Sequence, residues 1–218
     1  MYHLVGMRDF DTATIRDDLQ RLKIAAPAVF GSNGHHFTLN APLVEAELLA
    51  FEQQHAISLP VDYRRFLMEL GNGGAGPYYG VHPLGAFDGA TGEVEAWGDF
   101  VGSLAEPFAF REPWNDLTGR PDNALADSDE EEHERRMDAF ERRYWHPSVM
   151  NGAFPICHKG CALRIWLVVS GDEAGNVWSD DRADYNGIAP ILTHDRRRVT
   201  FGAWYTEWLD NALRTIDS

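Results

Sequence analysis

The sequence predicts an α+β fold in a single domain, with a mainly antiparallel sheet, a meander, flanked by helices. Runs with helical periodicity lie toward both ends of the chain, whereas short runs of β-branched and aromatic residues, separated by tight turns, lie between residues 154 and 178. Strands that follow one another through short turns pair antiparallel. The chain of 218 residues is 44% hydrophobic and 12% aromatic, so it can bury a full core without disulfides or metals.

The domain is expected to span residues 1–218, with an N-terminal helix and an extended segment in residues 1–40 and the core in residues 41–218. Asp11 or Thr12 can cap the first helix. Its apolar stripe consists of Ile15, Leu19 and Leu22. Residues 27–40 break the helical pattern and end in an alternation typical of an extended segment.

Two consecutive helices are expected between residues 42 and 70. Pro42 fits the first turn of the first helix, and Asn40 is its expected N-cap. The second helix is expected to begin at Leu59 and to end at Gly71, which can adopt the left-handed conformation. The inward residues are Val44, Leu48, Phe51 and His55 in the first helix and Tyr63, Phe66, Leu67 and Leu70 in the second.

A glycine-rich run at residues 71–76 connects the second helix to a strand expected at residues 79–84. Gly71, Gly73 and Gly76 have the spacing of the dinucleotide-binding fingerprint, but that fingerprint follows a strand and opens a helix. Here the glycines follow a helix and Pro77 leads into a strand. The run therefore predicts a tight turn, and we expect no nucleotide cofactor.

Residues 107–123 are expected to form a long irregular loop anchored by Phe108, Phe110 and Trp114, and loops of this length are often functional. A helix follows, capped at Asp127-Ser128, with acids in its first turn where the helix dipole favours them. Its inward stripe is Met137, Phe140 and Tyr144.

Strands are expected at residues 154–157, 163–170 and 177–178, with turns at residues 158–160 and 171–176. Thr200 is the expected cap of a final helix. The inward residues of that helix are Phe201, Trp204, Tyr205, Trp208 and Ala212.

The order of several motifs resembles the SUKH superfamily, the Smi- and Knr-like proteins. The motifs are E-x-E-x-x-x-F-E at residues 45–52, LP-x-x-Y-R-x-F-L at 59–67, GNGGAGPYYG at 71–80, ICHKGC at 156–161, LVVSG-x-x-x-GNVW-x-D-x-R at 167–182 and FGAWYTEWLD at 201–210. The resemblance implies a SUKH-like fold and a protein-binding function. It points to an immunity protein of a bacterial polymorphic toxin system, or to an intracellular adaptor.

The net charge of the chain is -15, from 19 basic and 34 acidic residues. This acidity argues against binding to nucleic acid or to anionic membranes and favours a basic protein partner, although acidity also serves solubility. The dipole of a helix favours acids at its start, so the acids at residues 129–132 can stabilise a helix, bind a basic partner, or do both. The candidate partner-binding residues are Glu93, Glu95, Asp99, Glu130, Glu131, Asp180, Asp181 and Asp184.

Metal and catalytic sites are not expected. Cys157, His158 and Cys161 form one Cys-His-Cys cluster without the second ligand pair of a structural zinc site. We expect the two cysteines to be small, partly buried residues that bracket a hairpin turn, and a zinc site and a redox role are the alternatives. The acids at residues 180–184 lack the spacing of a calcium-binding EF-hand loop. His35 and His36 are adjacent and diverge on any regular element, and no nucleophile elbow or zincin motif is present.

We therefore expect a non-enzymatic protein that neutralises a basic toxin domain by occlusion. An adaptor of the same family is the first alternative, and a metal-dependent hydrolase is the second. The chain start lacks the pattern of a signal peptide, and two cysteines make no disulfide framework, so a cytoplasmic location is expected. The oligomeric state stays open.

Overall fold

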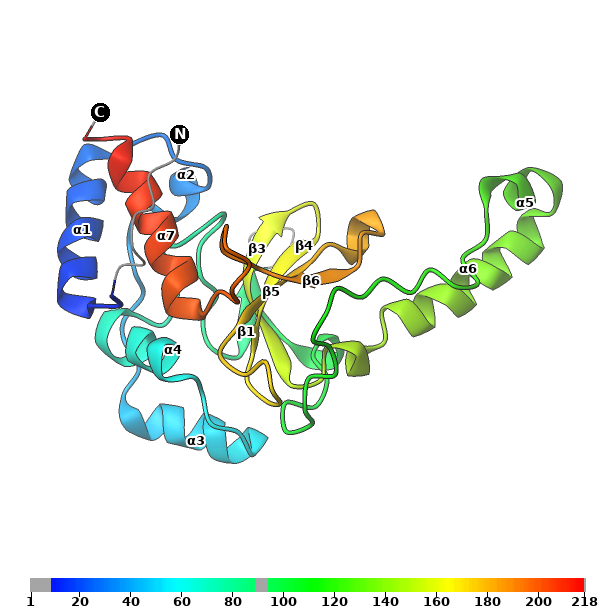
Figure 1. Ribbon diagram of the computed structural model, residues 1–218, viewed down its shortest axis with the longest axis horizontal. Helices are drawn as coiled ribbons and strands as arrows, with labels where there is room; N and C mark the ends of the chain where they lie inside the picture. The colour runs from blue at the N-terminus through cyan, green and yellow to red at the C-terminus, as the bar shows by residue number, and fades with distance from the viewer. Residues whose placement is uncertain (1–8, 89–93, 218) are drawn as a thin grey trace.

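The computed structural model describes residues 9–88 and 94–217, and its centre is a four-stranded antiparallel sheet (Figure 1). The strands β3 (Ala153–Gly160), β4 (Leu163–Val168), β5 (Val177–Asp180) and β6 (Ile188–Pro190) neighbour one another in chain order. Trp166 of β4 pairs with Trp178 of β5 in this ladder. The predicted α+β class and the predicted meander are thus confirmed, with β6 as a strand that the sequence pattern did not indicate.

A layer of helices packs on one side of this sheet (Figure 1). It consists of α1 (Thr12–Ala25), α2 (Ser32–His35), α3 (Glu45–His55), α4 (Val61–Arg65) with the π-helical turn η1 (Phe66–Leu70), and α7 (Phe201–Arg214). Aromatic rings join the layer to the sheet, since the ring centroid of Tyr63 in α4 lies 5.7 Å from that of Phe154 in β3. Within the layer, the ring centroid of Phe66 lies 5.2 Å from that of Phe201 in α7. The predicted inward residues of α1, the α4–η1 helix and α7 are buried, except that Trp208 is half-buried.

Two expectations for the helix ends are wrong. The N-cap of α3 is Val44 and not Asn40, and the N–H of Val44 donates to the Glu47 carboxylate at 2.9 Å. The Val44 side chain, which was expected to face inward, is 62% exposed. Gly71 does not adopt the left-handed conformation, because its φ of 178° is extended backbone. Glycine is needed there for close approach, since a Cβ atom would lie 2.5 Å from the Asn40 carbonyl oxygen.

The strand expected at residues 79–84 is also wrong, because only Val81 forms isolated bridges, to Gly74 and Cys157. Tyr78 and Gly80 have φ values of 53° and 98°, which twist the backbone out of a regular ladder. A short hairpin that the pattern did not indicate follows instead, with β1 (Ala86–Asp88) paired to β2 (Val94–Ala96) and then the 3₁₀ turn η2 (Gly98–Phe100).

The other face of the sheet carries a second, smaller core. Its buried members are Phe108, Met150, Ala153, Trp166, Val168, Trp178 and Ile188. Phe108 comes from the long irregular segment, and its ring lies 4.9 Å from that of Trp178. The expectation that aromatic residues anchor this segment is confirmed, since Trp114 also forms a bridge to Ile188 of β6.

Between the long irregular segment and the sheet, α5 (Asn123–Ser128) and α6 (Glu130–Tyr144) lie outside the two cores, and the 3₁₀ turn η3 (Pro147–Met150) returns to the sheet. A last 3₁₀ turn, η4 (Arg182–Asp184), follows β5. Among the described residues, none of the helices has both the length and the apolar character that crossing a bilayer requires.

Candidate functional site

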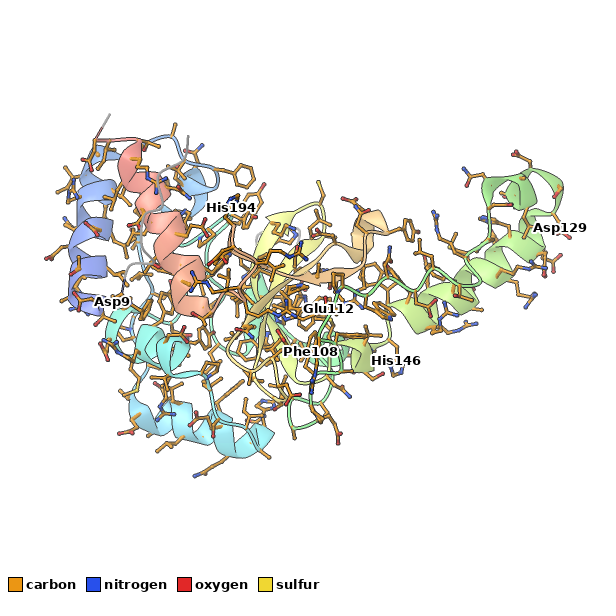
Figure 2. All side chains as sticks on the ribbon, viewed as in Figure 1. Asp9, Phe108, Glu112, Asp129, His146 and His194 are labelled. Atoms are coloured by element: carbon orange, nitrogen blue, oxygen red, sulfur yellow. The ribbon has the colours of Figure 1, made fainter. Side chains whose placement is uncertain are left out.

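Residues 115–146, which we call the arm, project away from the body of the protein (Figure 1). The chain runs outward as an extended segment, turns through α5 at the far end and returns along α6. Asp129 lies at the far end and His146 at the body (Figure 2). The 15 residues of α6 correspond to a helix of about 22 Å. The far end is therefore held well clear of both cores.

Aspartate side chains cap both helices at the far end of the arm. The backbone N–H of Leu125 donates to the carboxylate of Asp122 at 3.0 Å, which caps α5. The N–H of Glu132 donates to the carboxylate of Asp129 at 3.1 Å, which caps α6 one residue after α5 ends. The predicted structural reason for acids at this helix start is thus confirmed, and the cap moves from residues 127–128 to Asp129.

The arm tip, which we define as residues 121–134, is the most concentrated charge in the chain. It contains seven acids and no Lys or Arg: Asp122, Asp127, Asp129, Glu130, Glu131, Glu132 and Glu134. Glu132 is engaged by Arg135 and Arg136 at 2.7 Å, and these hydrogen bonds lower the pKa of its carboxyl to about 2. Within the described residues Glu130 and Glu131 are exposed and form no ion pair. The tip therefore presents free negative charge at neutral pH.

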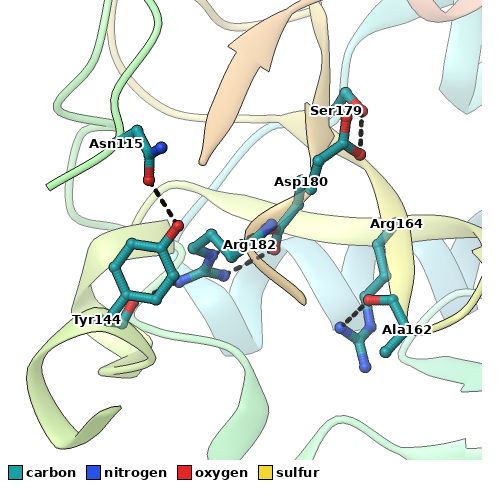
Figure 3. A network of polar contacts seen from close by, with 8 residues as sticks. Asn115, Tyr144, Ala162, Arg164, Ser179, Asp180 and Arg182 are labelled. Atoms are coloured by element: carbon teal, nitrogen blue, oxygen red, sulfur yellow. Dashed lines mark hydrogen bonds and ion pairs between the residues drawn. The ribbon is translucent and has the colours of Figure 1, made fainter. Parts of the chain in front are cut away.

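A buried polar network fixes the root of the arm (Figure 3). The hydroxyl of Tyr144 donates to Oδ1 of Asn115 at 2.7 Å, and the ring of Tyr144 stacks on Trp114 with centroids 5.6 Å apart. Arg182 donates to the backbone carbonyl of Tyr144 at 3.0 Å and makes two bonds to the Asp180 carboxylate, at 2.8 and 2.7 Å. The end of α6 is thereby tied to the end of β5.

One predicted contact residue is wrong, because it is buried in this network. Asp180 is 1% exposed and both of its carboxylate oxygens are bound by Arg182, so it cannot meet a partner. Asp181 is half-buried and pairs with Lys159 at 2.5 Å, whereas Asp184 in η4 is exposed. In the described part of the chain, no group of three or more His, Cys, Asp or Glu residues is placed to hold a metal ion.

The other predicted contact residues lie elsewhere. Glu95 in β2 and Asp99 in η2 are exposed, and Glu93 lies outside the described residues. The structure thus distributes the predicted acids over the arm tip, the β2–η2 segment and the β5–η4 segment. Of these three regions, the arm tip has the highest density of acids.

The two cysteines occupy different environments. Cys157 is buried in β3 opposite Ile165, and burial raises the pKa of its thiol. Cys161 is exposed and lies in the β3–β4 turn itself, with a φ of 50°. The expectation that they face one another across the turn is wrong, because β3 runs on to Gly160 and moves the turn to residues 161–162.

A pocket of about 350 Å³ opens between the end of α3 and the β2–η2 segment. It is lined by Phe51, Gln54, His55, Gly85, Trp97, Gly98, Val101, Gly102 and Leu104. Helical spacing places Phe51 and His55 on one inward stripe, and no local pattern indicates that a cavity lies beside them. Trp97 closes it from a segment more than 40 residues away in the chain, which helical periodicity cannot reveal.

Comparison with known proteins gives one match. The model of the SMI1 / KNR4 family (SUKH-1) matches residues 42–194, which are 153 of the 218 residues. No curated protein and no solved structure matches the chain significantly. The matched region runs from before α3 to beyond β6 and so contains the whole sheet and the arm. The chain therefore belongs to the SMI1 / KNR4 family (SUKH-1), as the order of its motifs predicted.

Proposed function

We propose that this protein is a non-enzymatic binding module that neutralises a basic toxin domain by occlusion in the cytoplasm. Family membership supports a protein-binding role of this kind, and the net charge of -15 supports a basic partner. The observation that carries the proposal is the arm tip, where seven acids are held away from the body and, in the described part of the chain, only Glu132 among them is paired with arginines.

The geometry suits electrostatic capture. Exposed charges are screened beyond about 8 Å at physiological salt. A helix of about 22 Å carries the acids of the tip farther than that from the arm root, so a partner meets their field before it meets the body. Complementary fields of this kind accelerate association more than they slow dissociation.

The ordered contacts at the arm root hold the arm in one orientation relative to the body. Because Tyr144 is buried and bonded to both Asn115 and Arg182, the arm is attached through ordered contacts and not through a free hinge. A pre-ordered arm loses little conformational entropy on binding. The bound toxin domain would then be covered on its basic, substrate-facing surface. An adaptor of the same family would use the same arm, and the identity of its partner separates the two functions.

The test compares two variants of equal net charge. In E130Q/E131Q/E134Q three exposed acids of the arm tip are neutralised, whereas in D17N/E106Q/E207Q three exposed acids of the body are neutralised. Association with the cognate toxin domain is followed by stopped flow, and residual toxin activity is measured in parallel. We expect the tip variant to associate about tenfold more slowly and the body variant less than about twofold. Equal effects of both variants would show that only the net charge matters.

A further inference from the structure

Three of the nine residues that line the pocket at the end of α3 are aromatic: Phe51, His55 and Trp97. The ring centroids of Phe51 and His55 are 4.5 Å apart, those of Phe51 and Trp97 are 5.8 Å apart, and those of His55 and Trp97 are 6.3 Å apart. Trp97 is fixed from behind by stacking on Phe154 at 4.9 Å. The indole N–H of Trp97 is buried, so Trp97 offers the pocket its ring and no hydrogen bond. The three rings pack against one another beside the opening, and a cation that lies within about 6 Å of a ring centroid is attracted to the face of that ring.

The charges around the pocket also favour a cation. No lining residue is acidic or basic apart from His55, and burial lowers the pKa of His55, which keeps the ring uncharged at neutral pH. Glu95 and Asp99, both exposed, lie two residues before and two residues after Trp97. The pocket lining is therefore uncharged at neutral pH, and two exposed acids lie close to it in the sequence, on a chain whose net charge is -15.

The volume limits what can enter. Pockets for small molecules usually measure about 300–1,000 Å³, and this one, at about 350 Å³, lies at the lower end. It admits one extended side chain but not a folded segment. A guanidinium group stacks on aromatic faces and is more weakly hydrated than an ammonium group, so arginine fits better than lysine.

We propose that the pocket of Phe51, His55 and Trp97 receives an arginine side chain of the basic protein partner. This inference rests on the proposed function, because it names a second point at which the same partner is held. Arginine and tryptophan are enriched among the residues that carry most of the binding energy in protein interfaces. The arm tip would govern how fast the partner arrives, and the pocket would govern how long it stays.

The first experiment tests the pocket without the partner. Acetyl-arginine amide is titrated into the full chain, and the ¹H–¹⁵N signals of the Gly98 and His55 backbones are followed. Acetyl-citrulline amide, which has nearly the same shape and no charge, is the matched probe. We expect saturable shifts for arginine with a Kd on the order of 10 mM, and shifts at least about fivefold smaller for citrulline. Equal shifts for both probes, or no shift for arginine, would overturn the proposal.

The second experiment uses the partner and three variants on the exposed side of α3. Gln54 lines the pocket and is exposed, so Q54K places a competing cation at its border and Q54E an anion. Q53K adds the same charge at the neighbouring exposed residue, which does not line the pocket. We expect Q54K to raise koff about tenfold or more, Q54E to lower it, and Q53K to change it less than about twofold.

These outcomes separate the two proposals. If Q54K and Q53K change koff equally, the pocket does not hold the partner, while capture by the arm is untouched. If the chain binds no basic toxin domain at all, the proposed function fails, and the arginine titration still decides whether the pocket takes a guanidinium group.

Discussion

The ion pair at the root of the arm allows a sharp prediction. Asp180 and Arg182 are 1% and 3% exposed, and two side-chain hydrogen bonds of 2.8 and 2.7 Å join them. In R182M the Asp180 carboxylate stays buried without its partner. Removing one member of a buried pair typically costs about 3–5 kcal/mol, because an uncompensated charge is left behind. We expect a loss of that size in the free energy of unfolding.

The double variant R182M/D180L is the decisive comparison. Replacing both members by apolar residues of similar size removes the buried charge together with its partner, and such replacements are often neutral or stabilising. We expect the double variant to recover most of the stability that R182M loses. It still lacks the bond from Arg182 to the Tyr144 carbonyl, so it separates the stability of the sheet from the attachment of the arm.

Urea denaturation at neutral pH measures both variants, with midpoints and slopes compared to the unmodified chain. The variant Y144F serves as a mild control, since it removes one hydrogen bond to Asn115 and is expected to cost about 1 kcal/mol. If R182M costs less than about 1 kcal/mol, the pair is reached by water and does not fix the arm. A double variant less stable than R182M would refute the argument from the unpaired charge.

Three further predictions concern the core, the pH dependence and the cysteines. F66A empties a fully buried site and should cost about 3–5 kcal/mol in urea denaturation, and a cost below about 1 kcal/mol would contradict this packing. Burial lowers the pKa of His35 and His82 from 6.5 to about 4 and about 3. Only the unfolded chain therefore takes up these protons as the pH falls below 6.5, so stability is complete above that pH and should decline by up to roughly 2.7 kcal/mol per pH unit near pH 5. H82Q should halve that slope, and an unchanged slope would contradict the assignment. Elemental analysis should find less than about 0.1 equivalents of zinc, because structural sites need about four ligands, and one equivalent lost in C157S/C161S would contradict this.

The elements that local patterning determines were predictable from the sequence. Ile15, Leu19 and Leu22 recur at helical spacing and are buried in α1, and the runs around Trp166 and Trp178 form the expected antiparallel pair. Each of these signals lies within one element. Packing then adds long-range contacts without changing the period.

The failures arose where distant segments decide the local conformation. Gly71 is glycine because the Asn40 carbonyl approaches it, and no local signal shows that approach. β6 has three residues and depends on pairing with β5 and on the bridge from Trp114. Asp180 looked like an exposed acid because it follows a strand beside Asp181, whereas Arg182 two residues later binds it in the interior.

The candidate site was only partly visible for the same reason. The acids at residues 129–132 were predicted to start a helix and to favour a basic partner, but nothing in their pattern shows that α5 and α6 project from the body. The one local signal is the lack of apolar residues on α6 before Met137, because a helical segment without an apolar stripe has no face to pack on the sheet.

The most direct test of the account is the salt dependence of association with the cognate toxin domain. The association rate constant is measured by stopped flow over a salt series, for the unmodified chain and for E130Q/E131Q/E134Q. Electrostatic capture by the arm tip predicts that salt slows kon by about an order of magnitude or more in the unmodified chain, with little change in koff, and that the variant has a shallower dependence. A kon that stays constant across the series, or an identical slope for both proteins, would contradict capture by the arm.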